Sequence, residues 1–184
     1  MRLSKAGYYA DFVIYPPLIL AMALPALMPA TLRSGLAWVV AFALGLAAWT
    51  LIEYLIHRVV LHHFRFFSEM HDLHHAEPRG YIGTPTWLSL GILCFGVLVP
   101  LWWATGPQIA AGAGAGLVLG YLWYVGLHHV VHHWRLRHDS YLYRVKRRHA
   151  QHHHGHVPCN FGVTSSFWDR VFGTEHGMAD VRRP

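Results

Sequence analysis

The sequence predicts an all-α integral membrane protein with four transmembrane helices in two hairpins and a cytoplasmic helical histidine-rich cap. Two observations lead to this prediction. Hydrophobic residues make up 54% of the 184 residues and charged residues only 13%, with a mean hydropathy of +0.27, which is too apolar for an ordinary soluble domain. All 17 histidines lie within residues 57–75 and 128–176. The length predicts a single membrane-embedded domain over residues 1–184.

Four segments without a charged residue approach the thickness of a bilayer. They are residues 12–30, 36–52, 87–104 and 109–127. At about 1.5 Å per residue, each would be about 26 to 29 Å long as a helix, close to the hydrocarbon core of about 30 Å. The first segment is the least regular, because its four prolines each lack a backbone donor: Pro16, Pro17, Pro25 and Pro29. We expect it to be kinked, shortened, tilted or re-entrant.

Short connections join the predicted spans into two antiparallel hairpins, and the basic residues indicate their orientation. Arg33 is the only one of the fifteen Lys and Arg residues on the side of the short loops, residues 31–35 and 105–108. By the positive-inside rule, both termini and both histidine-rich parts are expected to be cytoplasmic. We interpret the net charge of +6 as membrane topology rather than nucleic-acid binding. The first apolar run is too long and proline-rich for a cleaved signal peptide.

A stripe of glycines at four-residue spacing runs along the fourth span, at Gly112, Gly116 and Gly120. Such a stripe allows two helices to approach closely. It therefore predicts tight packing, either within the bundle, which we favour, or across the face of a homodimer.

Four histidine motifs supply ten imidazoles as candidate metal ligands. They are His57-x-x-x-x-His62, His71-x-x-His74-His75, His128-x-x-x-His132 and His149-x-x-His152-His153. Residues three and four apart share a helix face, so the last three motifs are each expected to project their rings toward one place. A spacing of five rotates the second ring by about 140°. His57 and His62 therefore require a local helix break or approach a metal from different sides.

Ten imidazoles predict two metal ions, since one ion rarely takes more than about six ligands and a catalytic site keeps a position open. Neutral imidazole suits iron, zinc, copper or nickel, so spacing does not choose the metal. Three acidic residues are candidates to orient the histidines by accepting a ring N–H: Glu53, Glu69 and Asp72. The other histidines are expected mostly to support the ligands or lie at the surface: His63, His129, His133, His138, His154, His156 and His176. By spacing alone, His129 and His133 could replace His128 and His132.

The order and spacing of these motifs resemble the fatty acid hydroxylase and sterol desaturase superfamily over roughly residues 49–175. The match includes Glu53-Tyr-x-x-His57-Arg before the first motif's second histidine, and Tyr124-x-x-x-His128, which favours the His128 and His132 register. Residues 140–146 and 161–174 look especially like the fatty acid 2-hydroxylase branch. The cytochrome b5 domain that eukaryotic members often carry is not matched.

This resemblance implies a non-haem di-iron monooxygenase that uses O₂ and two reducing equivalents to hydroxylate a lipid acyl chain, in a fatty acid or in a sphingolipid or ceramide, near its headgroup. Zinc could occupy the site in purified protein. The implied partners are the lipid, the membrane and a separate electron-donor redox protein. The segment from Phe161 to Gly173 is expected either to cap the metal site or to serve packing alone. Four basic residues would bind an anionic headgroup or anchor the membrane topology: Arg58, Lys146, Arg147 and Arg148.

Two alternatives stay open at this point. A carotenoid or sterol hydroxylase or desaturase would use the same chemistry on another lipid. A membrane metal or haem carrier belongs to another class. It would need histidines facing one another within the spans, or polar ligands near the midplane, and the four spans offer neither.

Overall fold

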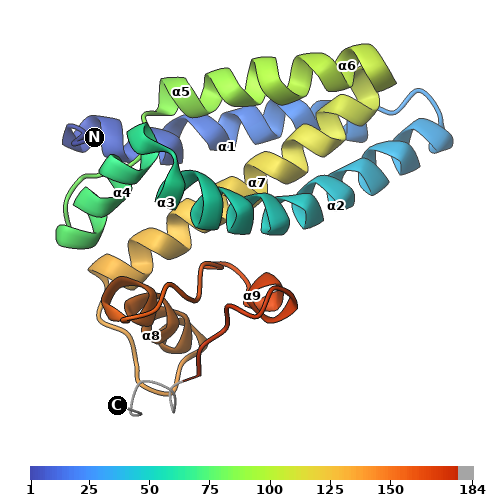
Figure 1. Cartoon of the computed structure of the whole chain (residues 1–184). Helices are drawn as coiled ribbons and strands as arrows, with labels where there is room; N and C mark the ends of the chain where they lie inside the picture. The colour runs from blue at the N-terminus through green and yellow to red at the C-terminus, as the bar shows by residue number, and fades with distance from the viewer. Residues whose placement is uncertain (178–184) are drawn as a thin grey trace. The chain divides into compact units, whose positions relative to one another are not determined.

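Four apolar helical runs dominate the computed structural model, which describes residues 1–177 (Figure 1). They are Lys5–Leu27, Leu32–His63, Thr86–Thr105 and Pro107–His133, and each is long and apolar enough to cross a membrane. Throughout the described residues the regular elements are helices. The predicted all-α fold with four membrane helices is confirmed. The observed runs extend past the predicted spans because a helix continues through flanking charged and histidine residues.

The first run is α1 (Lys5–Leu27) and the fourth is α7 (Pro107–His133), whereas the second and third runs each contain a π-helical turn. The second run consists of α2 (Leu32–Leu55), η1 (Ile56–Val60) and α3 (Leu61–His63). The third consists of α5 (Thr86–Gly91), η2 (Ile92–Leu98) and α6 (Val99–Thr105). The other helices are α4 (Arg65–Ala76), α8 (Tyr141–His154) and α9 (Phe167–Val171).

The contacts divide the chain into two compact units, which are described separately. Unit 1 comprises Met1–Trp49 and Tyr81–Leu122, and unit 2 comprises Thr50–Gly80 and the chain from Trp123 onward. Unit 1 contains most of the residues of the four membrane-length helical runs, and unit 2 contains the histidine motifs. A single domain over residues 1–184 stays a prediction.

In unit 1, α1 remains helical through three of its prolines, so its regular part is not shortened, whereas a tilted or re-entrant path in the membrane stays a prediction. The helix begins at Ser4, whose Oγ accepts a hydrogen bond from the Gly7 amide at 3.0 Å, a common N-cap. Near its other end, the Gln108 side-chain amide donates to the carbonyl oxygen of Pro25 at 3.0 Å. That bond satisfies one of the carbonyls that a helix end leaves open. Pro29 lies beyond the end of the helix.

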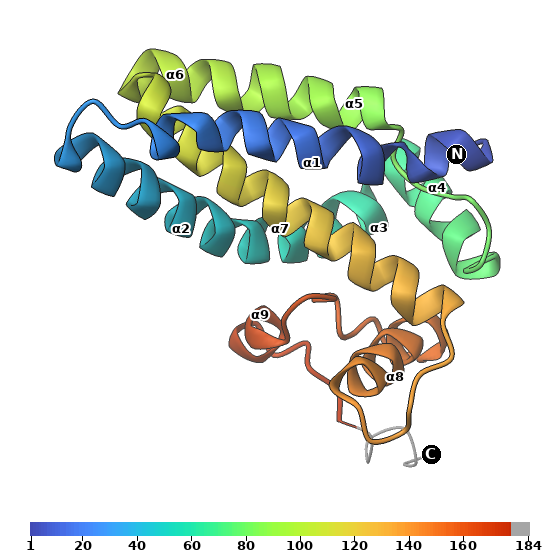
Figure 2. The ribbon, with the colours of Figure 1, turned by 180° about the vertical axis from the view of Figure 1, so that it is seen from behind.

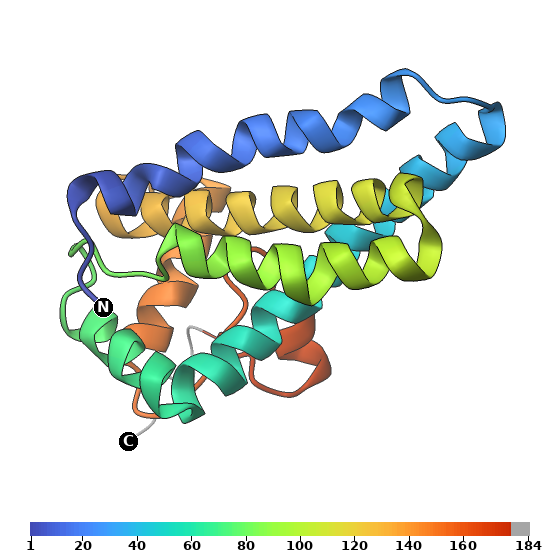
Figure 3. The same cartoon turned by 90° about the horizontal axis from the view of Figure 1, so that it is seen from above.

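A buried carboxylate that falls outside the predicted first span lies inside α1. Asp11 is 6% exposed, and its two oxygens accept hydrogen bonds from the Thr86 hydroxyl and the Tyr121 phenol, both at 2.6 Å. Beside it, the Tyr15 and Ser89 hydroxyls are 2.7 Å apart. A buried carboxylate without partners would be costly. These bonds therefore link α1 to α5, which runs alongside it in Figure 1, and to α7, which runs alongside it in Figure 3.

The glycine stripe packs α7 against α2 within unit 1 (Figure 2). A Cβ atom added to Gly116 would overlap the carbonyl oxygen of Phe42, and one added to Gly112 would overlap that of Trp38. The stripe thus serves packing inside the bundle, which is the favoured of the two predicted alternatives.

We expect Gly116→Ala to lower the free energy of unfolding by about 1 to 3 kcal/mol, because the new methyl group must displace backbone atoms of α2. Gly91→Ala is the matched control, since a Cβ there meets nothing within 4 Å, and we expect a change within about 1 kcal/mol in the stabilising direction. Thermal unfolding in detergent compares the two variants. Equal stability of both variants would contradict close packing at Gly116.

Candidate metal centre

Unit 2 gathers the four histidine motifs from η1 and α3, from α4, from the end of α7 and from α8. Their ring nitrogens form two groups, and within each group the ligand atoms lie within 4.8 Å of one another. The His57 group contains His57, His62, His71 and His152. The His74 group contains His74, His128, His132, His149 and His153. The tenth histidine, His75, places Nε2 at 2.9 Å from His71 Nε2 and 3.1 Å from His152 Nε2, beside the His57 group.

The π-helical turn η1 explains how the two histidines of the first motif, five residues apart, can face the same site. A π turn is closed by hydrogen bonds between residues five apart, so it brings residues at that spacing to nearly the same side of the helix. The rings of His57 and His62 are stacked with centroids 5.6 Å apart. The structure therefore contains the local helix break that this spacing requires.

The two three-histidine motifs each contribute to both groups, which differs from the expectation that three rings would share one place. On α4, His71 lies in the His57 group and His74 in the other group. On α8, His152 lies in the His57 group, whereas His149 and His153 lie in the His74 group. The reason is helical geometry, because positions three and four residues onward differ by about 100° around the axis.

Hydrogen bonds from the rings' other nitrogens show how two histidines of the His57 group are oriented. His57 Nδ1 lies 2.6 Å from the Phe161 carbonyl oxygen, and His152 Nδ1 lies 2.9 Å from the Cys159 carbonyl oxygen. A carbonyl only accepts, so both Nδ1 atoms carry the proton and both Nε2 atoms present lone pairs. Those two Nε2 atoms are 2.9 Å apart. Two lone pairs at this distance repel each other unless a cation lies between them.

The spacing of the nitrogens also fits metal ligation. Two imidazoles bound at about 2.1 Å to one ion, at right angles, have nitrogens about 3.0 Å apart. In the His57 group, His57 Nε2 lies 3.1 Å from His71 Nε2. In the His74 group, His132 Nε2 lies 2.8 Å from His149 Nε2 and 3.2 Å from His74 Nε2. The donor set therefore fits one metal ion in each group.

Burial keeps the ligand candidates neutral, which metal binding requires. Burial, reinforced by neighbouring histidines, lowers the pKa of His74 and of His75 to about 4. Burial likewise lowers the pKa of His152 to about 3 and that of His149 well below its usual value. At neutral pH these rings are uncharged and present a free lone pair.

The rings of His57 and His152 are oriented by the backbone carbonyls of residues 161 and 159, and not by the acidic residues that the sequence suggests. Glu53 accepts hydrogen bonds from the amides of Val163 and Thr164 at 2.7 and 2.9 Å, and from the Thr164 hydroxyl. Glu69 pairs with Arg65 on the exposed side of α4, and Asp72 is exposed.

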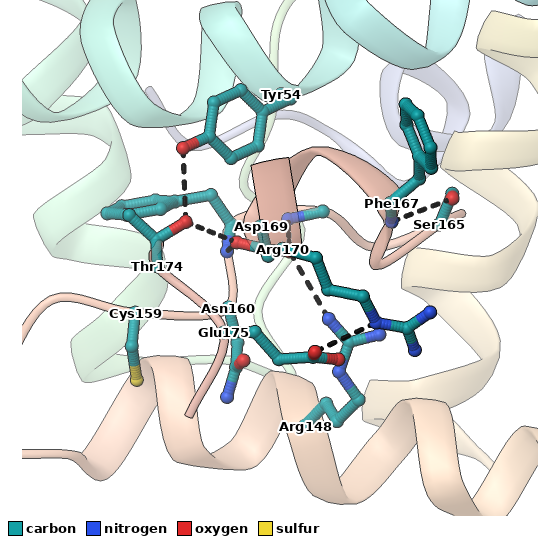
Figure 4. Close-up of polar contacts among 12 residues, drawn as sticks. Tyr54, Arg148, Cys159, Asn160, Ser165, Phe167, Asp169, Arg170, Thr174 and Glu175 are labelled. Atoms are coloured by element: carbon teal, nitrogen blue, oxygen red, sulfur yellow. Dashed lines mark hydrogen bonds and ion pairs between the residues drawn. The ribbon is translucent and has the colours of Figure 1, made fainter. Parts of the chain in front are cut away.

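The stretch from residue 159 to residue 175, called here the C-terminal segment, holds these carbonyls in place. Two carboxylates anchor this segment: Glu53, described above, and Asp169, which is fully buried. Asp169 accepts hydrogen bonds from the amides of Phe161 and Gly162 at 2.8 and 2.9 Å, and it forms an ion pair with Arg148 at 3.2 Å. Figure 4 shows this carboxylate among its neighbours. Nothing in the residue types around Asp169 marks this role, although the segment itself stands out in the sequence.

The remaining histidines lie outside both groups. His129 and His133 stack on each other with centroids 4.4 Å apart. The His74 group contains His128 and His132 instead, which is the register that the resemblance favours. The ring of His138 contacts Tyr143. His63, His154 and His156 are exposed, and His176 is partly buried beside Asn160, whose side-chain oxygen accepts its amide at 3.0 Å.

Comparisons with known proteins give the relatives of this chain. The sequence model of the fatty acid hydroxylase family matches residues 42–174. Ceramide very long chain fatty acid hydroxylase SCS7 of Saccharomyces cerevisiae is 35% identical over 154 residues, covering 74% of this chain and 38% of the yeast protein. Fatty acid 2-hydroxylase of Macaca fascicularis is 33% identical over 153 residues, covering 72% of this chain and 38% of the relative.

Plant and structural relatives extend the comparison. Dihydroceramide fatty acyl 2-hydroxylase FAH2 of Arabidopsis thaliana is 31% identical over 155 residues, covering 74% of this chain and 60% of the plant protein. The solved structure of full-length scs7p, of which only the hydroxylase domain is visible, superposes with a TM-score of 0.80 at 28% identity. That match covers 93% of this chain and 67% of the other.

Proposed function

Because this chain belongs to the fatty acid hydroxylase family, we propose that it is a membrane monooxygenase that hydroxylates the acyl chain of a fatty acid, or of a sphingolipid or ceramide, near its headgroup. The observation that carries the proposal is the pair of Nε2 lone pairs of His57 and His152 at 2.9 Å, within a set of ten converging imidazoles. The named activities of the yeast, monkey and plant relatives support the substrate class.

The ten histidines would hold two iron ions, one in each group, with His75 joining the His57 group. When bound, the iron pair would supply the oxidising power that an unactivated C–H bond requires and that side-chain acids and bases lack. The overall reaction consumes O₂, two electrons and two protons; one oxygen atom enters the lipid as a hydroxyl and the other leaves as water. A redox protein supplies the electrons.

The membrane places the substrate and the site together. Four bilayer-length helices make the chain an integral membrane protein. By the positive-inside rule, the histidine groups and both termini face the cytoplasm. The acyl chain would then lie in the bilayer while its headgroup stays near cytoplasmic basic residues such as Arg147. If the headgroup and the histidines share the cytoplasmic side, a carbon near the headgroup is the part of the chain that would meet the metals.

Lipid extracts from cells with and without the gene test the proposal. We expect a lipid that is heavier by one oxygen atom and carries the hydroxyl on its acyl chain, only in cells that express the chain. Cells that express a His152→Ala variant are the control for indirect effects. An oxidised carotenoid or sterol would contradict the substrate class. No oxygenated product under aerobic, reducing conditions would contradict the activity and favour a metal carrier.

A further inference from the structure

The two histidine groups differ in what their outward ring nitrogens contact. In the His57 group, two Nδ1 atoms donate to backbone carbonyls, as described above. In the His74 group, the Nδ1 atoms of His74, His149 and His153 are buried and have no hydrogen-bond partner among the described residues. A metal-bound imidazole is better oriented and more basic when its other nitrogen donates to an acceptor. The two metal positions are therefore chemically unequal.

The backbone that supplies the two carbonyls is held in an unusual conformation. Asn160, between the two carbonyl residues, is 1% exposed and has a φ of 54°, in the left-handed region that Asn tolerates better than most residues. Its amide donates to the Thr174 carbonyl at 2.9 Å, and its side chain donates to Gln151 at 3.0 Å. This left-handed turn at Asn160 lets the carbonyls of residues 159 and 161 reach histidines on two different helices.

Asp169 fixes the part of this turn whose carbonyl, that of Phe161, contacts His57. One of its oxygens accepts the Phe161 amide at 2.8 Å and the Thr174 hydroxyl at 2.9 Å. Its other oxygen accepts the Gly162 amide at 2.9 Å. The Thr174 hydroxyl lies in turn 3.0 Å from the Tyr54 hydroxyl (Figure 4). Asp169 therefore binds the N–H group of the Phe161–Gly162 peptide, whose oxygen contacts His57 Nδ1. It also binds the N–H group of the preceding Asn160–Phe161 peptide.

We propose that Asp169 is a positioning residue for one metal ion: it holds the Phe161 carbonyl on His57 Nδ1 and thereby makes the His57 group the more slowly exchanging of the two metal positions. Asp169 itself binds no metal. The inference rests on the proposed function only in requiring two metal ions in one chain.

The test is the rate at which metal leaves the full-length protein in detergent. The protein is loaded with Zn²⁺, mixed with excess chelator, and followed with a zinc-sensitive dye. We expect two phases of equal amplitude for the wild type. Asp169→Asn should accelerate the slow phase by about 10-fold or more, in line with the usual effect of removing such support, and leave the fast phase unchanged.

Glu175→Gln is the matched control. It makes the same carboxylate-to-amide change in the same segment, but it breaks only the exposed contact with Arg170 at 2.8 Å, so both phases should keep their wild-type rates. Thr174→Val removes one of the hydrogen bonds to Asp169, together with the contact to the Tyr54 hydroxyl. It should accelerate the slow phase by a smaller factor, and it decides the question if Asp169→Asn fails to fold.

Two results overturn different statements. If the wild type releases two metal ions but Asp169→Asn, or Thr174→Val in its place, changes both phases equally or neither, the positioning role of Asp169 is wrong and the proposed function stands. If the wild type binds fewer than two metal ions under loading conditions, the dinuclear centre itself fails, and this inference fails with it.

Discussion

Replacing His152 with alanine is expected to abolish lipid hydroxylation and to remove the metal ion of the His57 group. His152 Nε2 lies 2.9 Å from His57 Nε2 and 3.1 Å from His75 Nε2, so its loss takes one ligand from the centre of that group. Loss of supporting contacts alone typically costs 10- to 100-fold, and we expect a lost ligand to cost at least about 100-fold in turnover. Hydroxylated lipid per unit of protein and metal per chain are measured on the same sample.

His154→Ala is the matched control for this variant. His154 follows the same motif on α8 but is exposed and lies outside both groups. We expect wild-type turnover and metal content for it. A His152→Ala protein that keeps its metal and its activity would show that His152 is not a ligand.

Acidification is the second change with a large expected effect. An unfolded histidine has a pKa near 6.5, whereas burial lowers the pKa of His74 and His75 in the folded protein to about 4. Between these values the unfolded chain binds more protons than the folded one. The stability of metal-free protein should therefore be full above about pH 6.5 and fall as the pH drops toward 4. Thermal unfolding of chelator-treated protein across this range measures the effect.

Metal-loaded protein provides the comparison for the acid experiment. Protons compete with the cation for the same ring nitrogens, so the loaded protein should resist acid to a lower pH and then lose metal and stability together. An unfolding temperature of the metal-free protein that does not change between pH 6.5 and 4 would contradict burial of neutral histidines.

The membrane helices and the convergence of the histidine motifs could be predicted from the sequence, because charge-free runs and helical spacing are local patterns. The spans were predicted too short, since nothing in the charge pattern showed that α1 could carry a buried Asp11. Its partners, Thr86 and Tyr121, come from distant parts of the chain. A five-residue histidine spacing did indicate a helix break, and the π turn η1 provides one.

The supporting contacts of the site could not be predicted in this way. The acceptors for His57 and His152 are backbone carbonyls, and a carbonyl belongs to every residue, so no residue type marks it. The carboxylates that the sequence offers near the motifs anchor loops or lie at the surface. Spacing within one helix separates the second and third histidines of each motif by about 100°. It does not determine which group each ring joins, because that depends on how α4 and α8 face one another.

The number of metal ions per chain tests the central claim most directly. Protein produced in iron-rich medium, purified without chelator and measured by elemental analysis against its amino-acid content should contain about two metal ions per chain. His152→Ala and His149→Ala should each contain about one, because they disrupt different groups. A wild-type value of one or none would contradict a two-metal centre built from these ten histidines.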